Sequence, residues 1–519
     1  MLRGSSLCSY KRNLETTHNL GRMLCAGVFV ALLALTMVLP IYANNIQVNS
    51  VTVIPSGSYA YVQFNLSWDN SWKDSTNWDA AWVFVKYRKT DDTSWNHAYL
   101  NTTAGNHTIP ESYECSVGDT GGNGMGVFIY RDSVSSGSVS LTGVQLRWDY
   151  SDNGLSSTDT VTVKVFAIEM VYIPTGSFYI GDGNGTTESA YAFHTGTGNS
   201  AVEVIDSLVN DIRVDANSYD DNQLETAGIG IDGDGGIDTN DDGSIDNANF
   251  PTGYTAFYCM KYEISQGQYA DFLNTLTATQ DSTRYYSTSS NRYTIGGSAG
   301  SRSASVPDRA CNFLSWMDDA AYADWAGLRP MTELEFEKIC RGPKNAVSGE
   351  FAWGNANIAN FGYTLSDDGQ PTATVSNAAS DPTGNASYST TTGSINGPLR
   401  CGIFADSDST RAEAGDSYYG VMEMSGNLWE RPVTLGNGDG RSFEGSHGDG
   451  ALSTNGNATN SDWPGESGGE VTGALGAGFR GGYWVGGTSY LCVSDRSVAA
   501  GPDADRNHHF GFRCVRSAP

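Results

Sequence analysis

The stretch Gly420–Pro432 reads GVMEMSGNLWERP, and it places two acids around a step of small residues. Glu423 and Glu430 flank Ser425-Gly426-Asn427, and Trp429 comes one place before the second acid. Small residues let a backbone turn sharply, and glycine adopts conformations that other residues avoid. The stretch therefore has three interpretations, which are a catalytic carboxylate pair, a metal-binding loop and a tight turn that lets Trp429 reach the core.

Length and composition predict two globular units built from short strands and loops. The chain has 519 residues, with 62 glycines and only 17% charged residues. Its 12 Trp, 27 Tyr and 19 Phe supply large apolar surfaces for a core. The formal net charge of −28 argues against nucleic acid and against an anionic membrane as partners. An acidic surface suits solubility and Ca²⁺ outside the cell.

The first 43 residues have the layout of a secretory signal peptide. A basic segment with Arg3, Lys11, Arg12 and Arg22 precedes the apolar run Met23–Leu39, and small Ala43 lies at the expected cut. The alternative is an uncleaved membrane anchor, because the apolar run is long. Cleavage predicts an exported protein that is secreted, periplasmic or at the cell surface, with no membrane contact afterwards.

Residues 44–168 predict a β-sandwich accessory domain. Segments that alternate apolar and polar residues are separated by Asn, Asp, Gly and Ser clusters, as in 60–68, 80–89, 126–130, 144–150 and 160–168. No nucleophile, base or ligand set gathers there. A binding module and a spacer or packing partner are both open interpretations.

A second unit, residues 169–519, predicts an α+β domain rich in loops. Two helices are expected, over 312–327 and 330–342, and Thr332 and Glu335 stand at capping-box spacing at the start of the second. The protein is therefore expected to be mainly β, with an α+β second domain.

An acidic insertion at about 182–250 predicts a calcium loop. Positions 1, 3, 5 and 9 of such a loop fall on Asp238, Asn240, Asp242 and Asp246, and Gly243 occupies the bend. Asn249 stands where a bidentate Glu is usual. The alternative is a solvated acidic linker.

Seven cysteines follow the expected signal peptide. Cys115 is alone in the first half, where a buried apolar role is expected. The other six are Cys259, Cys311, Cys340, Cys401, Cys492 and Cys514. In an exported protein they could form up to three disulfides, and the sequence allows fifteen pairings.

Seven blocks of the second unit occur in the order of a known family. They are MVYIPTGSFYIG, CMKYEISQGQYADFLN, SWMDDAAYADWAGLRPMTELEFEKICRG, FAWGN, YYGVMEMSGNLWE, FRGGYW and GFRC. Together they resemble the formylglycine-generating enzyme domain, or sulfatase-modifying factor domain, over about residues 169–519. The resemblance implies a variant of the C-type lectin fold with little regular structure, long loops and bound Ca²⁺.

The resemblance also implies an oxidase that converts a sulfatase cysteine to formylglycine with a copper ion on two thiolates. Soft thiolates suit Cu(I). Here the first cysteine position is Gly486, and the second falls near Leu491 or Cys492. Cys340 and Cys514 stand at family disulfide positions, and Cys492 could pair with Cys340. The copper pair is incomplete.

Family calcium ligands carry over to the quoted stretch. They are Glu423, the carbonyls of Gly426 and Leu428, and Glu430, with Trp429 as a core anchor. A second family site matches Asn360 and the carbonyl of Phe361. Arg431 replaces the usual aromatic residue, which resembles a non-catalytic branch that displays loops such as 436–510 on a rigid scaffold.

These observations leave three functional hypotheses. The first is an exported, calcium-stabilised, non-catalytic protein that binds a protein or glycan ligand. The second is an oxidoreductase that uses Cys492 with copper, or an iron centre, on a protein or small thiol substrate. The third is a structural cell-surface protein.

Overall fold

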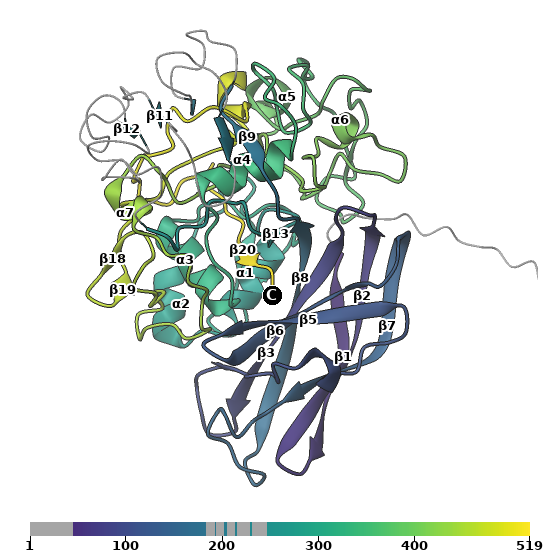
Figure 1. The fold of residues 1–519 in the computed structure, drawn as a ribbon, viewed down its shortest axis with the longest axis vertical. Coiled ribbons are helices and arrows are strands. Elements are labelled where there is room, and N and C mark those ends of the chain that lie inside the picture. Colours follow the sequence, from purple (N-terminus) through teal and green to yellow (C-terminus); the bar gives the residue numbers. More distant parts are fainter. Residues whose placement is uncertain (1–44, 183–191, 194–201, 205–212, 215–228, 231–246) are drawn as a thin grey trace, which may run out of the picture. The chain divides into compact units, whose positions relative to one another are not determined.

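The computed structural model describes residues 45–182, 192–193, 202–204, 213–214, 229–230 and 247–519. The expected signal peptide and the predicted calcium loop from Asp238 to Asp246 lie outside these residues. The described chain is mainly β with few helices (Figure 1).

Two antiparallel sheets contain all the N-terminal strands, and the second also takes in two short strands from the C-terminal half. The first has three strands in the order β1-β2-β7, which are β1 (Gln47–Ser56), β2 (Tyr59–Lys73) and β7 (Ser135–Trp148). The second has the order β20-β13-β8-β3-β6-β5, with β4 (Asn96–His97) paired to β3. Its other strands are β3 (Asp79–Lys89), β5 (Tyr113–Thr120), β6 (Asn123–Arg131), β8 (Val161–Ile173), β13 (Phe257–Met260) and β20 (Val515–Ser517).

The two sheets share one hydrophobic cluster. Along β2, Val62, Phe64, Leu66 and Trp68 are buried and alternate with partly exposed residues, as a strand with one core face requires. They pack with Val83 and Val85 of β3 and with Val127 and Ile129 of β6. The alternation of apolar and polar residues that predicted a strand here is therefore matched by the alternating burial of β2.

Strand β8 passes through the position where the sequence suggested a domain boundary. It pairs with β3 from Val161 to Val171 and with β13 from Met170 to Ile173, so backbone pairing runs without a break across residues 168 and 169. Figure 1 shows β8 extending from the N-terminal strands towards β13 and the helices. Any motion between the two halves would have to break this ladder.

The C-terminal half carries the helices and several short strand pairs. The helices are α1 (Gln266–Leu273), α2 (Ala278–Arg284), α3 (Trp316–Trp325), α4 (Glu333–Arg341), α5 (Ser389–Thr392), α6 (Arg411–Ala414) and α7 (Gly438–Arg441), with 3₁₀ turns at Ala104–Asn106 and Thr488–Leu491. The two-stranded pairs involve β9 (Phe178–Ile180) with β10 (Val202–Val204), β11 (Arg213–Val214) with β12 (Ile229–Gly230), β14 (Ile295–Gly296) with β15 (Ser303–Ala304), β16 (Leu365–Ser366) with β17 (Thr374–Val375), and β18 (Glu466–Ser467) with β19 (Glu470–Val471).

Capping chemistry explains where the four longer helices begin. Ser265, Thr277, Ser315 and Thr332 are the N-caps of α1 to α4, and each forms a reciprocal capping box. The predicted helices at 312–327 and 330–342 correspond to α3 and α4, and the Thr332–Glu335 box is confirmed. Sequence reasoning missed α1 and α2, although both begin with the same S/T-x-x-Q signature.

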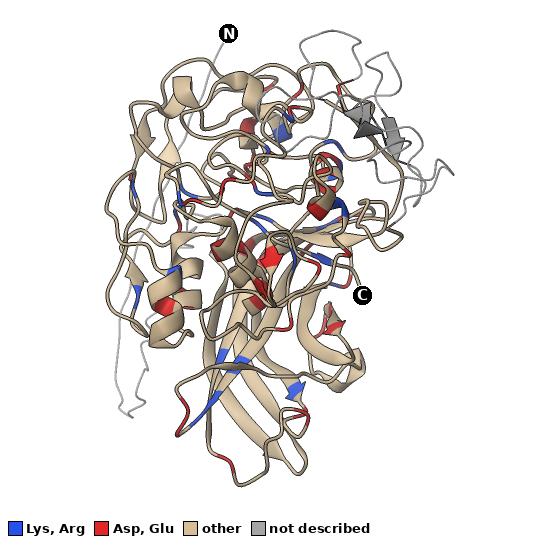
Figure 2. Cartoon of the chain, turned by 90° about the vertical axis from the view of Figure 1, so that its left-hand side faces the viewer, with Lys and Arg blue, Asp and Glu red and all other residues tan. Residues whose placement is uncertain are grey.

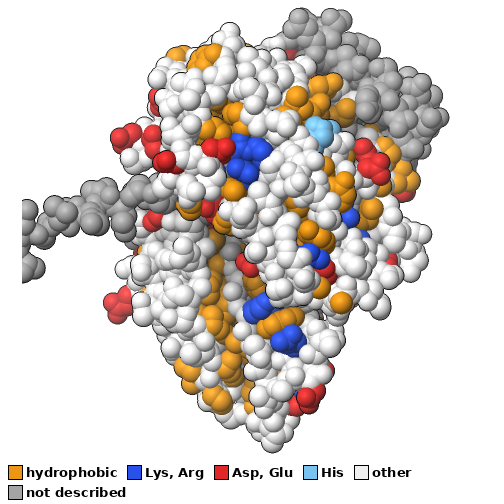
Figure 3. All heavy atoms as spheres, turned by 180° about the vertical axis from the view of Figure 1, so that it is seen from behind, with side chains coloured by type: hydrophobic (Ala, Val, Ile, Leu, Met, Phe, Trp, Pro, Cys, Tyr) orange, Lys and Arg blue, Asp and Glu red, His pale blue; other side chains and the backbone are white. Residues whose placement is uncertain are grey.

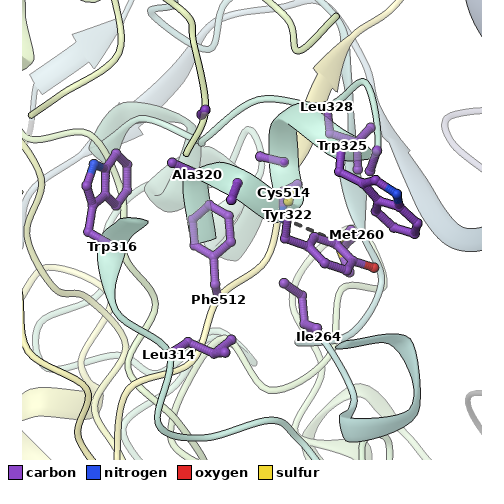
Figure 4. Close-up of a cluster of buried hydrophobic side chains, with 14 of the residues drawn as sticks. Met260, Ile264, Leu314, Trp316, Ala320, Tyr322, Trp325, Leu328, Phe512 and Cys514 are labelled. Carbon is purple, nitrogen blue, oxygen red and sulfur yellow. Dashed lines mark hydrogen bonds between the residues drawn. The ribbon is translucent and has the colours of Figure 1, made fainter. Parts of the chain in front are cut away.

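Helices and N-terminal strands share a second core cluster. Figure 4 shows the part of it around α3 and Phe512. Trp82 and Phe84 of β3 belong to it together with Trp325 of α3 and Phe512. The indole nitrogen of Trp82 donates to the carbonyl of Ala326 at 2.9 Å. The N-terminal strands therefore share a hydrophobic core with α3 and with the C-terminal segment around Phe512. Within the described residues, no helix has the length and apolar character needed to cross a membrane.

Candidate functional site

The quoted stretch forms a tight turn under the C-terminal loops. Glu423 and Asn427 have φ values of 55° and 67°, and Gly426 has φ 95°. A Cβ at Gly426 would lie 2.5 Å from the carbonyl oxygen of Ser387, so this position requires glycine. All residues from 421 to 432 are buried.

Three buried carboxylates gather around this turn. Glu263 accepts a hydrogen bond from the side chain of Asn427 and one from the backbone nitrogen of Leu428, the latter at 2.8 Å. Glu423 accepts from the backbone nitrogen of Gly402 at 2.5 Å. Oε1 of Glu430 accepts from Nε of Arg513, also at 2.5 Å. Burial raises the pKa of Glu423 to about 7 and raises the pKa of Glu263 and Glu430 as well.

Arg513 is the counter-charge that the sequence did not reveal. The Arg513 side chain is fully buried, and the side chain of its partner Glu430 is only 1% exposed. The motif GFRC was noted for its place in the family order, but nothing local connects its arginine to a glutamate 83 residues earlier. Glu263, inside the block CMKYEIS, was missed for the same reason.

The two glutamates of the quoted stretch differ in how far their charge is already compensated. Oε2 of Glu423 and Oε2 of Glu430 have no hydrogen-bond partner, which leaves oxygens available. The positive charge beside Glu430, however, is already supplied by the Arg513 guanidinium. Among the described residues, no three or more His, Cys, Asp or Glu side chains are grouped as metal ligands. Calcium binding through Glu423, Gly426, Leu428 and Glu430 stays a prediction.

The second expected calcium position is a surface loop. Asn360 is exposed, and Phe361 is 41% exposed with its ring 6.2 Å from that of Tyr363. Calcium at this position also stays a prediction.

At the expected copper position, Gly486 has no room for a cysteine side chain, and the thiol of Cys492 has a raised pKa. A Cβ on Gly486 would lie 2.8 Å from Cε1 of Tyr483, so the aromatic ring occupies the space that a cysteine side chain would need. Cys492 follows the 3₁₀ turn Thr488–Leu491, and its thiol lies 3.7 Å from the carbonyl oxygen of Gly349. Burial, followed by the nearby acids Asp495, Asp182 and Glu350, raises the pKa of this thiol to about 12. The residues present do not fit a two-thiolate copper site.

The disulfides suggested by the sequence are not formed. All seven cysteines in the described part of the chain are free thiols. Cys340 packs in a cluster with Val171 and Phe336, whereas Cys492 packs against the cluster that contains Phe351 and Leu491. The two therefore serve different apolar clusters, and the Cys340–Cys492 pairing is a correction to the expectation.

An aromatic pocket lies where the C-terminal loops meet the quoted stretch. Its cavity has a volume of about 540 Å³. The lining residues are Trp429, Phe479, Tyr483, Tyr490, Val498, Gly501, Pro502, Asp503, Asn507, His509 and Phe510. The ring of Trp429 lies 5.3 Å from Tyr483 and 5.5 Å from Tyr490 between centroids. Trp429 was expected to be only a core anchor, but it also forms part of the pocket wall.

Arg431 supports this pocket from below. Its guanidinium lies 4.6 Å from the ring of Phe479 and 5.2 Å from that of Phe510, and it donates to the carbonyl of Asp503. The residue noted only as a departure from the family is thus fully buried beneath the pocket. Figure 2 shows acidic and basic segments close together among the helices and loops, which is consistent with a scaffold held by internal charge pairs.

Arg480, from the block FRGGYW, forms two of these internal charge pairs. It donates to Glu333 at 2.8 Å and to Glu337 at 2.6 Å, both on α4, and all three side chains are fully buried. The pair fixes the backbone between Phe479 and Tyr483 against a helix. Phe479 and Tyr483 of the pocket therefore flank a residue that is anchored to α4 by buried ion pairs.

A model of the sulfatase-modifying factor enzyme 1-like domain matches residues 156–518. The chain belongs to this family. The matched region contains both the turn and the aromatic pocket of this family member. Among solved structures, Treponema denticola variable protein 1 is similar, at 13% identity, covering 68% of this chain and 96% of that one, with a TM-score of 0.31. No curated protein matches the chain.

Proposed function

We propose that this chain is an exported, non-catalytic binding protein of the sulfatase-modifying factor enzyme 1-like family. The observation that carries the proposal is the state of the copper position. Tyr483 fills the space beside Gly486, and Cys492 is a buried thiol surrounded by acids. A thiolate there is disfavoured, so the metal-dependent oxidation of a cysteine has no ligand pair to start from.

The aromatic pocket is the proposed binding site. Aromatic faces provide apolar contact area at low entropic cost, and Asp503, Asn507 and His509, which also line the cavity, supply hydrogen-bonding groups. Its volume is in the range of pockets for small ligands or for a protruding side chain. A glycan or an apolar side chain of a protein both suit this chemistry.

The binding half of the proposal is tested with immobilised glycans and with peptides that carry Trp, Tyr or Leu, using the purified protein and its Tyr490→Ala variant. Tyr490 is only partly buried, so its truncation removes one wall of the pocket without opening the core. Phe361→Ala is the matched control, because it removes an exposed aromatic ring elsewhere. Retention lost in Tyr490→Ala and kept in Phe361→Ala supports the site. Equal retention by all three proteins contradicts it.

The non-catalytic half is tested by copper titration under reducing conditions. We expect no stoichiometric copper in the wild type. Tight Cu(I) binding that disappears in Cys492→Ser would instead favour the oxidoreductase alternative, acting on a protein or small thiol substrate. A structural cell-surface role is the remaining alternative, and it predicts that neither ligand class binds.

Calcium stabilisation is part of the same proposal. The partnerless Oε2 atoms of Glu423 and Glu430 motivate it, and the Arg513 pair argues for a weak site. A melting temperature unchanged by EDTA and by added Ca²⁺ would remove calcium from the proposal. Export is tested by fractionating cells that express the full chain.

A further inference from the structure

A lysine and two carboxylic acids meet inside the sheet that both halves of the chain share. Asp79 begins β3, Glu169 lies on β8, and Lys261 directly follows β13. These strands are neighbours in the order β13-β8-β3 (Figure 1). Asp79 pairs with Val171, two residues beyond Glu169, so the two acid side chains lie on the same face of the sheet. We name Asp79, Glu169 and Lys261 the buried triad.

The buried triad is almost closed to solvent. The side chains of Lys261, Asp79 and Glu169 are 5%, 0% and 2% exposed. Nζ of Lys261 lies 3.2 Å from Oε2 of Glu169 and 3.9 Å from Oδ2 of Asp79. On the face that Figure 3 shows, charged side chains stand in small separate groups at the surface. The triad instead concentrates three ionisable groups inside the molecule, where a charge is costly unless it is paired.

The charges of the buried triad do not balance. One ammonium compensates one carboxylate, so a second ionised carboxylate would be buried without a partner. Burial outweighs the opposing effect of Lys261, and it raises the pKa of Glu169 to about 7 and also raises the pKa of Asp79. One of the two carboxyl groups therefore readily holds a proton at neutral pH, which makes the triad neutral as a whole.

Asp79 is held by donors on both of its oxygens. Oδ2 accepts a hydrogen bond from the indole nitrogen of Trp68 at 2.9 Å. Oδ1 accepts from the hydroxyl of Ser71 at 2.7 Å and from the backbone nitrogen of Trp72 at 3.0 Å. When a nucleophile adds to a carboxyl carbon, negative charge develops on oxygen, and fixed donors stabilise that charge. The surroundings of Asp79 therefore favour attack on its Cγ atom.

Glu169 is placed to move a proton. Its Oε2 accepts from Nζ of Lys261, whereas its buried Oε1 has no hydrogen-bond partner. Burial alone would lower the pKa of Lys261, but Tyr262 and the two acids outweigh it and raise this pKa. The lysine therefore rests as an ammonium, and a nucleophilic amine forms only when a neighbouring carboxylate takes its proton. A reaction of this amine is expected to be slow.

We propose that Lys261 and Asp79 become joined by an intramolecular amide bond, with Glu169 as the catalytic acid and base. Glu169 relays a proton from Nζ to the Asp79 carboxylate, and the neutral amine then adds to Cγ of Asp79. Glu169 next relays a second proton from the nitrogen to one Asp79 oxygen, which leaves as water. The Nζ–Cγ bond forms, one Cγ–O bond breaks, and Glu169 ends in the protonation state in which it began. No oxidant or other reactant takes part.

The amide removes the imbalance of charge inside the sheet. It carries no charge, so the single remaining acid can stay protonated beside it. A cavity of about 580 Å³, lined by residues that include Lys261, Ser71 and Trp72, can receive the released water. The bond would tie the start of β3 to the segment after β13. This inference does not depend on the proposed function of the aromatic pocket.

Tryptic peptide mapping of the purified, denatured full chain tests the proposal by mass spectrometry. Trypsin cleaves after a lysine only when its side-chain amine is free, so the amide leaves the bond after Lys261 uncut. We expect a branched peptide that joins the segments containing Lys261 and Asp79 and is one water lighter than their sum. Lys86 is the internal control, because it is equally buried but donates to the carbonyl of Gly450, which is not a carboxyl group. Complete cleavage after Lys86 shows that digestion is not the limit.

Glu169→Gln separates the amide bond from a plain buried ion pair. The substitution keeps the size of the side chain but removes the proton relay, so we expect only linear peptides from this variant. A branched peptide from the wild type, together with linear peptides from Glu169→Gln, supports the proposal.

Three results overturn the proposal. The first is a wild type that still gives linear Lys261 and Asp79 peptides after weeks at neutral pH, which decides the matter whether or not the variant folds. The second is a branched peptide that is joined through Glu169 instead of Asp79. The third is a Lys261–Asp79 branch that forms equally in Glu169→Gln, because Glu169 is then not the catalyst.

Discussion

Replacing Arg513 by methionine should destabilise the protein strongly, because it removes the counter-charge of a buried glutamate. Glu430 and Arg513 have side chains that are 1% and 0% exposed, and their Oε1 and Nε atoms are 2.5 Å apart. Removing one partner of a buried pair commonly costs about 3–5 kcal/mol, since the other charge is left without compensation. Glu263 lies in the same electrostatic environment and loses the same cation.

The size of this loss should depend on pH in a defined direction. Burial already raises the pKa of Glu430 above its ordinary value, while Arg513 lowers it. Without Arg513 the pKa rises further, so the native state of the variant holds its proton to higher pH. A raised native pKa gives stability at low pH that is lost as the pH rises through it. The destabilisation should therefore be larger at alkaline than at acidic pH.

Urea unfolding followed by tryptophan fluorescence at two pH values measures the effect as a shift in midpoint at constant slope. Arg147→Met is the matched control, because Arg147 forms a 2.7 Å pair with Asp149 in which the side chains are 27% and 15% exposed, so solvent screening makes the loss smaller than for the fully buried pair. Equal losses in the two variants would refute the reasoning.

Three further substitutions test separate parts of the structure. Gly486→Cys should not create a copper site, because its Cβ would lie 2.8 Å from the Tyr483 ring, and copper titration of the variant should match that of the wild type. Gly426→Ala should lower stability by about 1–3 kcal/mol in urea unfolding, since φ is 95° and the new Cβ would meet the Ser387 carbonyl. Burial raises the pKa of Asp416 to about 7. The native state therefore holds this proton more tightly than the unfolded state, and the melting temperature of the wild type should fall as the pH rises towards 7. Thermal melts of Asp416→Asn, which cannot ionise at this position, should show a smaller fall. A steeper fall in the variant would contradict this sign.

Local chemistry was predictable from the sequence where the partners are close along the chain. Thr332 and Glu335 are three residues apart, and their capping box identified the start of α4. The alternation in β2 identified its buried face. The missed helix α1 carries the same kind of cap at Ser265, so the signal was present but was not used.

The candidate site was less predictable because its contacts are distant in sequence. The turn at Gly426 was expected, but its surroundings depend on Arg513 and on Glu263, which belong to other segments. The aromatic pocket brings Trp429 together with residues from 479 to 510. The disulfide expectation failed for a related reason, since spacing along the chain says nothing about which apolar cluster a cysteine joins.

By itself the sequence determined the family, through the order of its blocks, and showed that Gly486 breaks the copper pair. It also determined the turn of the quoted stretch, because backbone conformation depends on the residues that occupy it. Only the tertiary structure decided that Glu430 meets a guanidinium and that Trp429 lines a pocket. It also decided that β8 continues from one half into the other. Conformational preferences are carried by neighbouring residues, whereas the partner of a buried charge or ring is whichever distant segment packs against it.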